Sequence, residues 1–252
     1  MSIDARFRDK LNFRDLGTYE TNDGRRVKPG YFFRGAGLDF FNENELNEFK
    51  KLGIKTIMDI RSSRETSLHP DPIIEDINHI EHSGLENDID WSPSGMSQVG
   101  GEGKQQIDKI INHYQNILLD NKAYQIMMKE IFDDNVPIYF HCAAGKDRTG
   151  AAAIILLLAL NVKEDEIKKD YFLSNVFLKE ILEEKLAKIA DRVNDYPELH
   201  VLTTILYGVY EDIFDVMMNS IKDRYDNYDD YIIEQFNIDK NQLDAFRDKY
   251  LY

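Results

Sequence analysis

The segment HCAAGKDRTG, residues 141–150, holds the side chains that could do chemistry in this chain. Cys142 is the only cysteine, and the cations Lys146 and Arg148 follow it closely. A thiol beside cations and the start of a helix has a lowered pKa, and its thiolate is a strong nucleophile. The segment therefore predicts a nucleophilic cysteine at position 142.

Apolar sequences on both sides place this segment in a turn between a strand and a helix. We expect a strand to end at Phe140 and an apolar helix to begin near Arg148. The backbone N–H groups of the turn and the positive end of the helix then face one small space, where an anion is stabilised. The Arg148 guanidinium can hold two oxygens of a tetrahedral anion, and the Thr149 hydroxyl can donate to the sulfur. The spacing Cys-x5-Arg-Thr thus predicts a loop that wraps one phosphate.

A purely structural role for Cys142 is the alternative, because a free cysteine is often a small buried residue at the end of a strand. A chance match to His-Cys-x5-Arg followed by Ser or Thr, in a chain of this length, is on the order of one in several hundred or rarer. Gly145, Lys146 and Asp147 within the segment make chance rarer still. We therefore favour the catalytic interpretation.

Composition describes an acidic globular protein. Of its 252 residues, 42% are hydrophobic and 12% aromatic, which is enough for a packed core, so we expect a single domain over residues 1–252. The formal net charge of −15 disfavours binding to nucleic acid or anionic membranes, so local positive charge must bind any anionic ligand. One cysteine excludes an intrachain disulfide and a cysteine-only zinc cluster.

The N-terminal sequence and the longest apolar run bear on location. MSIDARFRDKLNFRDLG contains no apolar stretch of signal-peptide length, and AAAIILLLAL is too short to span a bilayer. We expect a cytoplasmic protein without stable membrane insertion, with unconventional export as an open alternative. The sequence leaves the oligomeric state open.

Strand and helix patterns alternate through the first two thirds of the chain. A helix over residues 42–53 begins with an Asn42/Glu45 capping pattern and ends at Gly53. One or two further helices occupy residues 107–132, and strands are expected at residues 31–34, 54–60, 77–82 and 136–140. Such alternation predicts an α/β fold with a largely parallel sheet flanked by helices.

Only helical patterns follow Lys163. We expect a helical pair added after the phosphate-loop helix, as an appendage over roughly residues 163–230 that is a candidate lid within the domain. The segment WSPSGMSQVGGEG, Trp91–Gly103, is rich in Gly, Ser and Pro and predicts a long loop that could form a mobile rim.

HCAAGKDRTG resembles the phosphate-binding loop of cysteine-dependent protein tyrosine phosphatases. The Lys-Asp pair inside it is similar to a bacterial branch that also has phosphoinositide phosphatase activity. Two departures from that branch, Thr18 and Asp226, replace glycines in turns. Further stretches that resemble the branch are NFRDLGTY (12–19), FFRGAGL (32–38), MDIRSSRE (58–65) and RYDNYDDYIIEQFNIDKNQLDAFRDKYL (224–251).

The resemblance implies a mechanism through a phosphocysteine intermediate that needs no metal or other cofactor. Cys142 would attack phosphorus, and the resemblance places the general acid at Asp147. Trp91 and Pro93 invite comparison with the Trp-Pro-Asp acid loop of other tyrosine phosphatases, but no aspartate follows Pro93, so we reject that match. Phosphate would be bound by the loop residues Ala143, Ala144, Gly145, Lys146, Asp147 and Arg148.

Supporting roles are expected for residues near the same sheet edge. Asp59, at the end of its strand, could position substrate or serve as a reserve acid, or it could pair with Arg61 or Arg34. We expect His141 to point away from phosphate, orienting the loop from behind and tuning the sulfur. The pair His79 and His82 has a spacing that could bind a metal, but acidic or sulfur co-ligands are lacking in a matching motif, so we take both as ordinary surface or strand residues.

Three functions follow from the site. The first is a phosphatase for phosphotyrosine, with phosphoserine, phosphothreonine and phosphoinositides as further candidates, so that its partners are phosphorylated proteins or phosphoinositides. The second is a non-catalytic phosphate-binding module, which usually lacks the cysteine or the arginine that Cys142 and Arg148 supply here. The third is an arsenate reductase or sulfurtransferase, although such reductases need further cysteines. We favour the phosphatase.

Overall fold

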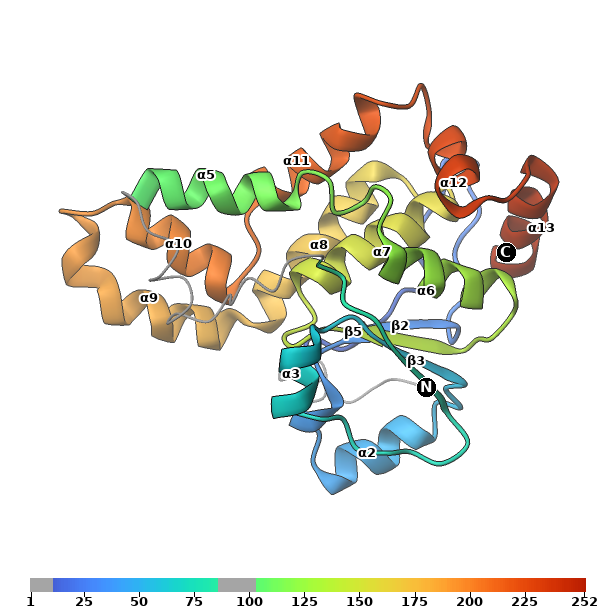
Figure 1. The fold of residues 1–252 in the computed structure, drawn as a ribbon, viewed down its shortest axis with the longest axis horizontal. Helices are drawn as coiled ribbons and strands as arrows, with labels where there is room; N and C mark the ends of the chain where they lie inside the picture. Colours follow the sequence, from blue (N-terminus) through green and yellow to red (C-terminus); the bar gives the residue numbers. More distant parts are fainter. Residues whose placement is uncertain (1–10, 86–102) are drawn as a thin grey trace.

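A five-stranded sheet lies at the centre of the computed structural model, which describes residues 11–85 and 103–252 (Figure 1). The strands lie in the order β1-β2-β5-β3-β4, with β1 antiparallel to β2 and the other neighbours parallel. The predicted α/β fold, a largely parallel sheet flanked by helices, is confirmed. The strand bounds are β1 Arg14–Asp15, β2 Phe32–Gly35, β3 Thr56–Asp59, β4 Asn78–Glu81 and β5 Ile138–His141.

Alternate residues of the central strand β5 face two separate cores. Phe140 packs into one core with α7 (Asp147–Ala159), whereas Tyr139 packs into the other with Phe49 of α2 (Glu43–Lys50). Successive side chains of a strand point to opposite faces, and Figure 1 shows α7 and α2 on opposite sides of the sheet. Burial on both faces explains why the sequence VPIYF is continuously apolar.

Helix α7, which follows the phosphate-loop segment, is enclosed by other helices. All of its residues from Arg148 to Ala159 are buried. Its sequence is apolar on every side, as a central helix requires. The neighbours that pack against it are α6 (Lys122–Phe132), α8 (Glu164–Phe177) and α12 (Tyr228–Phe236). The N-terminus of α7 therefore starts from a rigid support.

Helix α2 begins at the capping pattern that the sequence predicts. The Asn42 side chain accepts a hydrogen bond from the Glu45 N–H at 3.0 Å, and the Glu45 carboxylate accepts one from the Asn42 N–H at 2.7 Å. Gly53 follows the helix with φ of +67°, a conformation that glycine adopts without strain. This local stop signal directs the chain into β3.

Thr18 stands where the family resemblance would place glycine, and its φ is +75°. This left-handed region is costly for a β-branched side chain. The turn is nevertheless fixed, because the Thr18 N–H donates to the Val27 carbonyl at 2.7 Å. Threonine in place of glycine at position 18 therefore adds backbone strain to this turn.

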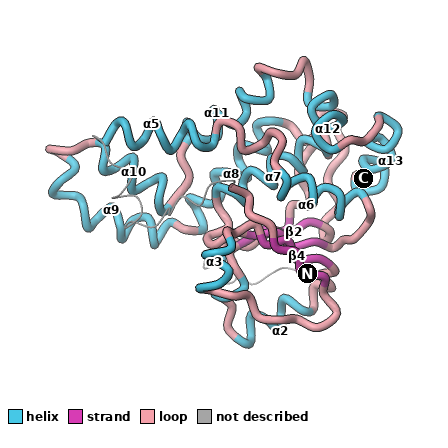
Figure 2. Tube along the Cα trace, viewed as in Figure 1, coloured by secondary structure: helices cyan, strands magenta, loops and turns pink. Residues whose placement is uncertain are grey.

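The helices after α7 divide into two groups. In Figures 1 and 2, α9 and α10 extend away from the sheet together with α5, which comes from much earlier in the chain. We call these three helices, α5 (Gly103–Tyr114), α9 (Lys179–Val193) and α10 (Glu198–Tyr207), the helical lobe. Within the range 163–230, predicted as one appendage, α8 packs on α7. The remaining helical elements are η1 Leu38–Phe40, α3 Ser63–Leu68, α11 Glu211–Lys222 and α13 Lys240–Tyr250.

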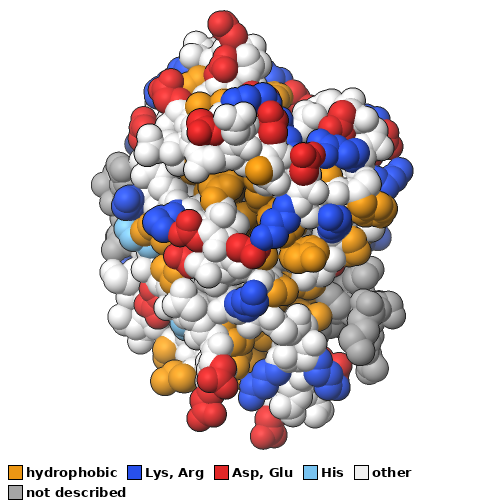
Figure 3. Space-filling view, turned by 90° about the vertical axis from the view of Figure 1, so that its right-hand side faces the viewer, with side chains coloured by type: hydrophobic (Ala, Val, Ile, Leu, Met, Phe, Trp, Pro, Cys, Tyr) orange, Lys and Arg blue, Asp and Glu red, His pale blue; other side chains and the backbone are white. Residues whose placement is uncertain are grey.

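The surface over α12 and α13 carries both signs of charge. Figure 3 shows Lys and Arg side chains intermixed with Asp and Glu side chains on this face. Asp229, for example, pairs with Lys240 at 2.9 Å and with Arg247 at 2.6 Å.

Among residues 11–85 and 103–252, no helix is both long and apolar enough to cross a membrane. Residues 91–102 of the predicted rim loop, including Trp91 and Pro93, lie outside the described residues.

Candidate active site

The loop between β5 and α7, residues 142–146, is shaped by a glycine that no other residue could replace without movement. Gly145 has φ of +65°. A Cβ atom on it would lie 2.2 Å from the carbonyl carbon and oxygen of Gly35, in the neighbouring strand β2. Only glycine combines this backbone conformation with such a close approach. The loop is therefore pressed against the carboxyl end of β2.

The loop carbonyls are bound by the surrounding protein. The Asn12 amide donates to the Gly145 carbonyl at 2.8 Å, and the Gly37 N–H donates to the Ala143 carbonyl at 3.1 Å. The buried Arg34 donates to the carbonyls of Gly145 and Lys146, at 2.9 and 3.2 Å. In the described chain, by contrast, none of the backbone N–H groups from Ala143 to Arg148 donates a hydrogen bond to another protein group. These N–H groups are free for an anion.

Cys142 begins this loop with a buried, acidic thiol. The residue is 3% exposed. Burial alone raises the pKa of the Cys142 thiol, but the charge of Arg148 and hydrogen bonds from the side chain and N–H of Thr149 outweigh it, so the pKa lies below its ordinary value. The Thr149 hydroxyl has no nitrogen or oxygen partner in the described structure, which leaves it for the sulfur. The environment thus favours the thiolate.

Arg148 is held in place by Glu65, a residue that the sequence analysis left without a role. The two terminal nitrogens of the Arg148 guanidinium, Nη1 and Nη2, donate to the two Glu65 carboxylate oxygens at 2.6 and 2.7 Å. Burial raises the pKa of Glu65, but Arg148 outweighs it and brings this pKa down to about 2. Glu65 also caps α3, where it accepts from the Ser62 N–H at 2.9 Å. The Ser-x-x-Glu spacing of Ser62 and Glu65 could have drawn attention to Glu65, because it predicts a capping box at the start of a helix.

Lys146 points away from the sulfur. Its ammonium donates to the carbonyls of Ile205 and Gly208, at 2.6 and 2.8 Å, at the C-terminal end of α10. It also pairs with Asp147 Oδ2 at 2.7 Å. This corrects the expectation that the Lys146 side chain stands beside Cys142, since free carbonyls at a helix C-terminus attract a cation more directly. The Lys146 side chain therefore connects the loop to the end of α10, and its backbone N–H remains on the loop.

A family comparison agrees with this geometry. The sequence model described as "Tyrosine phosphatase family" matches residues 6–252. The chain belongs to the tyrosine phosphatase family. Membership implies hydrolysis of phosphate monoesters.

Curated relatives of this phosphatase carry similar names. A Cupriavidus necator protein named "Putative tyrosine-protein phosphatase" is 27% identical over 241 residues, which is 95% of this chain and 86% of the relative. "Triple specificity protein phosphatase PtpB" of Mycobacterium tuberculosis is 28% identical over 189 residues, 65% of this chain and 66% of the relative. A "Tyrosine-protein phosphatase" of Nostoc commune is 28% identical over 159 residues, 58% and 49% respectively.

Behind the loop of the phosphatase, Asp59 and His141 lie in a buried polar cluster. Both Asp59 oxygens accept from Arg61, at 2.7 to 3.0 Å, so of the pairings expected for Asp59 the structure shows the one with Arg61. His141 faces away from the thiol: its Nδ1 lies 3.3 Å from the Cys142 carbonyl, and its Nε2 lies 2.9 Å from Asp71 Oδ2. Burial opposes protonation of His141, but Asp71 and Asp59 outweigh it and raise the pKa of His141.

A second buried cluster fixes Arg34, and its centre is Asp170 of α8. Asp170 accepts from Arg34 at 2.6 Å and from Arg14 at 2.7 Å, and all three side chains are buried. Burial raises the pKa of Asp170, but the two guanidinium groups outweigh it and lower this pKa to about 2. Arg14 therefore braces the N-terminal segment, and no motif in the sequence pointed to Asp170.

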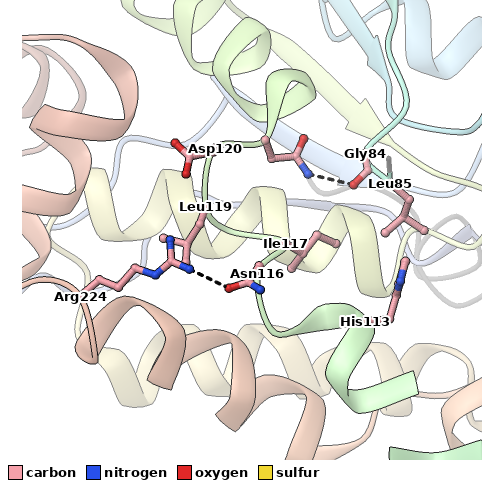
Figure 4. Close-up of a pocket in the computed structure, with 9 residues that line it drawn as sticks. Gly84, Leu85, His113, Asn116, Ile117, Leu119, Asp120 and Arg224 are labelled. Atoms are coloured by element: carbon pink, nitrogen blue, oxygen red, sulfur yellow. Dashed lines mark hydrogen bonds between the residues drawn. The ribbon is translucent and has the colours of Figure 1, made fainter. Parts of the chain in front are cut away.

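A separate cavity of about 330 Å³ lies beside the start of α6 (Figure 4). Figure 4 shows Arg224 directed toward Asn116, with a hydrogen bond of 3.1 Å, and Leu85 and His113 on the opposite side. Within the described residues its wall includes no member of the loop from Cys142 to Arg148. The cavity is therefore distinct from the loop between β5 and α7.

Proposed function

We propose that the protein hydrolyses phosphotyrosine through a phosphocysteine intermediate on Cys142. One observation carries this proposal: the buried thiol of Cys142, whose pKa is lowered by the charge of Arg148, begins a loop whose N–H groups make no hydrogen bond to other described protein groups. Backbone N–H groups and a bidentate guanidinium can stabilise the charge on three equatorial phosphate oxygens as the transition state forms.

The two chemical steps need one nucleophile and one proton carrier. In the first step the Cys142 thiolate forms the S–P bond, the P–O bond to the leaving group breaks, and Asp147 donates a proton to the departing oxygen. In the second step Asp147 accepts a proton from water, whose oxygen attacks phosphorus, and the S–P bond breaks. Inorganic phosphate leaves and the thiolate returns.

We prefer Asp147 to Asp59 as the general acid. Asp147 belongs to the first turn of α7; its Oδ2 pairs with Lys146 at 2.7 Å, and its Oδ1 makes no hydrogen bond within the described structure. Asp59 is fully buried, and its oxygens are occupied by Arg61. We therefore give Asp59 a supporting role in holding Arg61 and His141 beneath the loop.

Substrate breadth is the finer part of the proposal. The Mycobacterium tuberculosis relative is named a triple specificity phosphatase, and we extend phosphoserine, phosphothreonine and phosphoinositide hydrolysis to this chain from that similarity. A chromogenic aryl phosphate tests phosphatase activity itself. A panel of phosphopeptides and soluble phosphoinositides then ranks kcat/KM by substrate class. If the protein hydrolyses the aryl phosphate but no member of this panel, the proposed substrate breadth is wrong.

Replacing the acid gives a leaving-group test. Asp147→Asn removes the proton donor, so we expect hydrolysis of phosphoserine peptides or inositol lipids, which have basic leaving groups, to slow by roughly 100-fold or more. Aryl phosphates with acidic leaving groups need little protonation and should slow much less. The measurement is kcat for both substrate types.

Asp59→Asn is the matched control for Asp147→Asn. A positioning residue should affect both substrate types alike. Leaving-group sensitivity in Asp59→Asn, together with its absence in Asp147→Asn, would move the general acid to the end of β3.

We also propose that the helical lobe shields the thiol. Lys146 ties the loop to the last turn of α10 through the carbonyls of Ile205 and Gly208. Lys146→Met removes these contacts, so we expect inactivation by hydrogen peroxide to become severalfold faster, because exposed thiolates are oxidised readily. The measurement is the inactivation rate at a matched thiolate fraction, obtained from the pH dependence of alkylation.

Lys188→Met is the control for this experiment. Lys188 lies on α9, with its side chain 63% exposed and paired with Glu184. If both variants fold and are inactivated at the same rate, the lobe does not protect Cys142.

A further inference from the structure

Four side chains that can bind metal ions converge on the side of the sheet opposite α7. They are Asp59 of β3, His141 of β5, His79 of β4 and Asp71, which follows α3; one ligand atom from each lies within 4.8 Å of the others. Strand register explains the meeting of the first two, because Asp59 pairs with His141. His79 lies two positions earlier in this register, opposite Ile57, so its side chain emerges on the same face.

The buried atoms at the centre of this group are not satisfied by hydrogen bonds. His141 Nε2 and Asp71 Oδ2 belong to fully buried side chains and lie 2.9 Å apart, yet neither has a hydrogen-bond partner of acceptable geometry in the described residues. The His141 Nδ1 faces the Cys142 carbonyl at 3.3 Å. If Nδ1 donates to this carbonyl in neutral His141, the Nε2 lone pair faces a carboxylate oxygen, and either a proton on Nε2 or a metal ion bound by both atoms removes the repulsion.

His79 completes a set of three ligands and provides access. Its Nε2 lies 3.5 Å from the same Asp71 oxygen, and its side chain is 26% exposed. Tetrahedral zinc sites with bonds of about 2.0–2.1 Å have ligand atoms about 3.3 Å apart. The separations of 2.9 and 3.5 Å lie on either side of that value.

The surrounding charges also favour a divalent cation. The Arg61 guanidinium binds three carboxylates, those of Asp39, Asp59 and Asp71. Arg61 alone therefore faces three carboxylates, so further positive charge, from a protonated imidazole or from a metal ion, is favoured beside them. Arg61 takes Asp71 Oδ1 at 2.8 Å and leaves Oδ2 for another partner.

We propose that His79, His141 and Asp71 form a binding site for a first-row transition-metal ion, with Zn²⁺ as the best match to two imidazoles and one carboxylate. Arg61 and the Cys142 carbonyl orient the ligands, as outer-shell groups do in metal sites. This overturns the expectation that His79 lacks acidic co-ligands, because Asp71 is brought to it by the fold. Through His141, the ion would be attached directly to the base of the catalytic loop.

The test uses the full chain carrying Cys142→Ser, so that the catalytic thiolate cannot bind the probe metal. Titration with Co²⁺, followed by visible d–d absorption, and with Zn²⁺, followed by calorimetry, should give one site per chain. Adding His79→Gln should weaken binding by at least about 100-fold, since losing a ligand costs no less than losing an outer-shell partner. His82→Gln is the matched control, because His82 lies just after β4 and is outside the cluster; it should bind as the parent does.

Two outcomes overturn the proposal: no saturable binding by the parent, or equal binding by the His79→Gln and His82→Gln variants, which means an adventitious ion only. If His79→Gln does not fold, as judged by circular dichroism, Asp71→Asn replaces it with the same expected loss of binding. These readouts do not involve turnover, so they are independent of the proposed phosphatase reaction.

Discussion

Cys142→Ser is expected to abolish hydrolysis while phosphate analogues still bind. A serine hydroxyl at this position is not ionised at neutral pH and cannot replace a thiolate of lowered pKa. Removing a nucleophile typically lowers kcat by at least about 10⁴-fold. The measurement is kcat on an aryl phosphate with a clean preparation of the variant.

Binding should survive because the anion site is built from other groups. The free N–H groups of residues 143–148 and the Arg148 side chain remain in Cys142→Ser. We expect the tungstate dissociation constant, measured by calorimetry, to stay within about tenfold of wild type, or about 1.4 kcal/mol. Retained hydrolysis would contradict the nucleophile, and lost binding in a folded variant would contradict the description of the anion site.

Arg148→Lys should lower kcat by about 10²–10³-fold, the usual cost of losing one preorganised donor in a transition state. Lysine keeps the charge but lacks the planar fork, so it cannot hold two phosphate oxygens or pair side by side with Glu65. We expect KM to change less than kcat, because the lost interaction strengthens as charge develops on the equatorial oxygens. Steady-state kinetics with an aryl phosphate measures both values.

Arg26→Lys provides the control for charge-preserving substitution. Arg26 is half exposed and pairs with Glu20 on the surface. Its replacement should leave kcat unchanged. Near-normal kcat in Arg148→Lys would show that Arg148 supports the loop without stabilising the transition state.

Elements with local signals could be predicted well from the sequence. The Asn42/Glu45 capping box and the stop at Gly53 depend on residues within one helix, and both are found. Alternation of apolar strands and helices predicts the fold class for the same reason. The strand order β1-β2-β5-β3-β4 could not be predicted, because it depends on pairing between segments far apart in the chain.

The helical lobe shows the same limit. The apolar spacing of α5 predicts a helix, but an amphipathic pattern does not name the partner of its apolar face. The helices that pack against α5 are α10 and α11, which begin more than 80 residues further along the chain. The sequence therefore predicts helices after Lys163 without showing that an earlier one joins them.

Residues of the site were predictable where one short segment contains them. Cys142 and Arg148 share a loop, so their spacing alone indicates the chemistry. Glu65, Asp71 and Asp170 reach the same region from other segments, and each is selected by a buried guanidinium or imidazole that the sequence does not place. The direction of Lys146 is likewise decided by carbonyls in α10, about 60 residues further along the chain.

The most direct test of the central claim is to trap the phosphorylated enzyme. Wild-type protein is mixed with an aryl phosphate, quenched in acid within one turnover, digested and analysed by mass spectrometry. We predict one phosphoryl group on the peptide that contains residues 141–148, attached to the sulfur of Cys142, and none on that peptide from Cys142→Ser. A phosphoryl group on another residue, or steady turnover with no trapped intermediate, would contradict phosphocysteine catalysis.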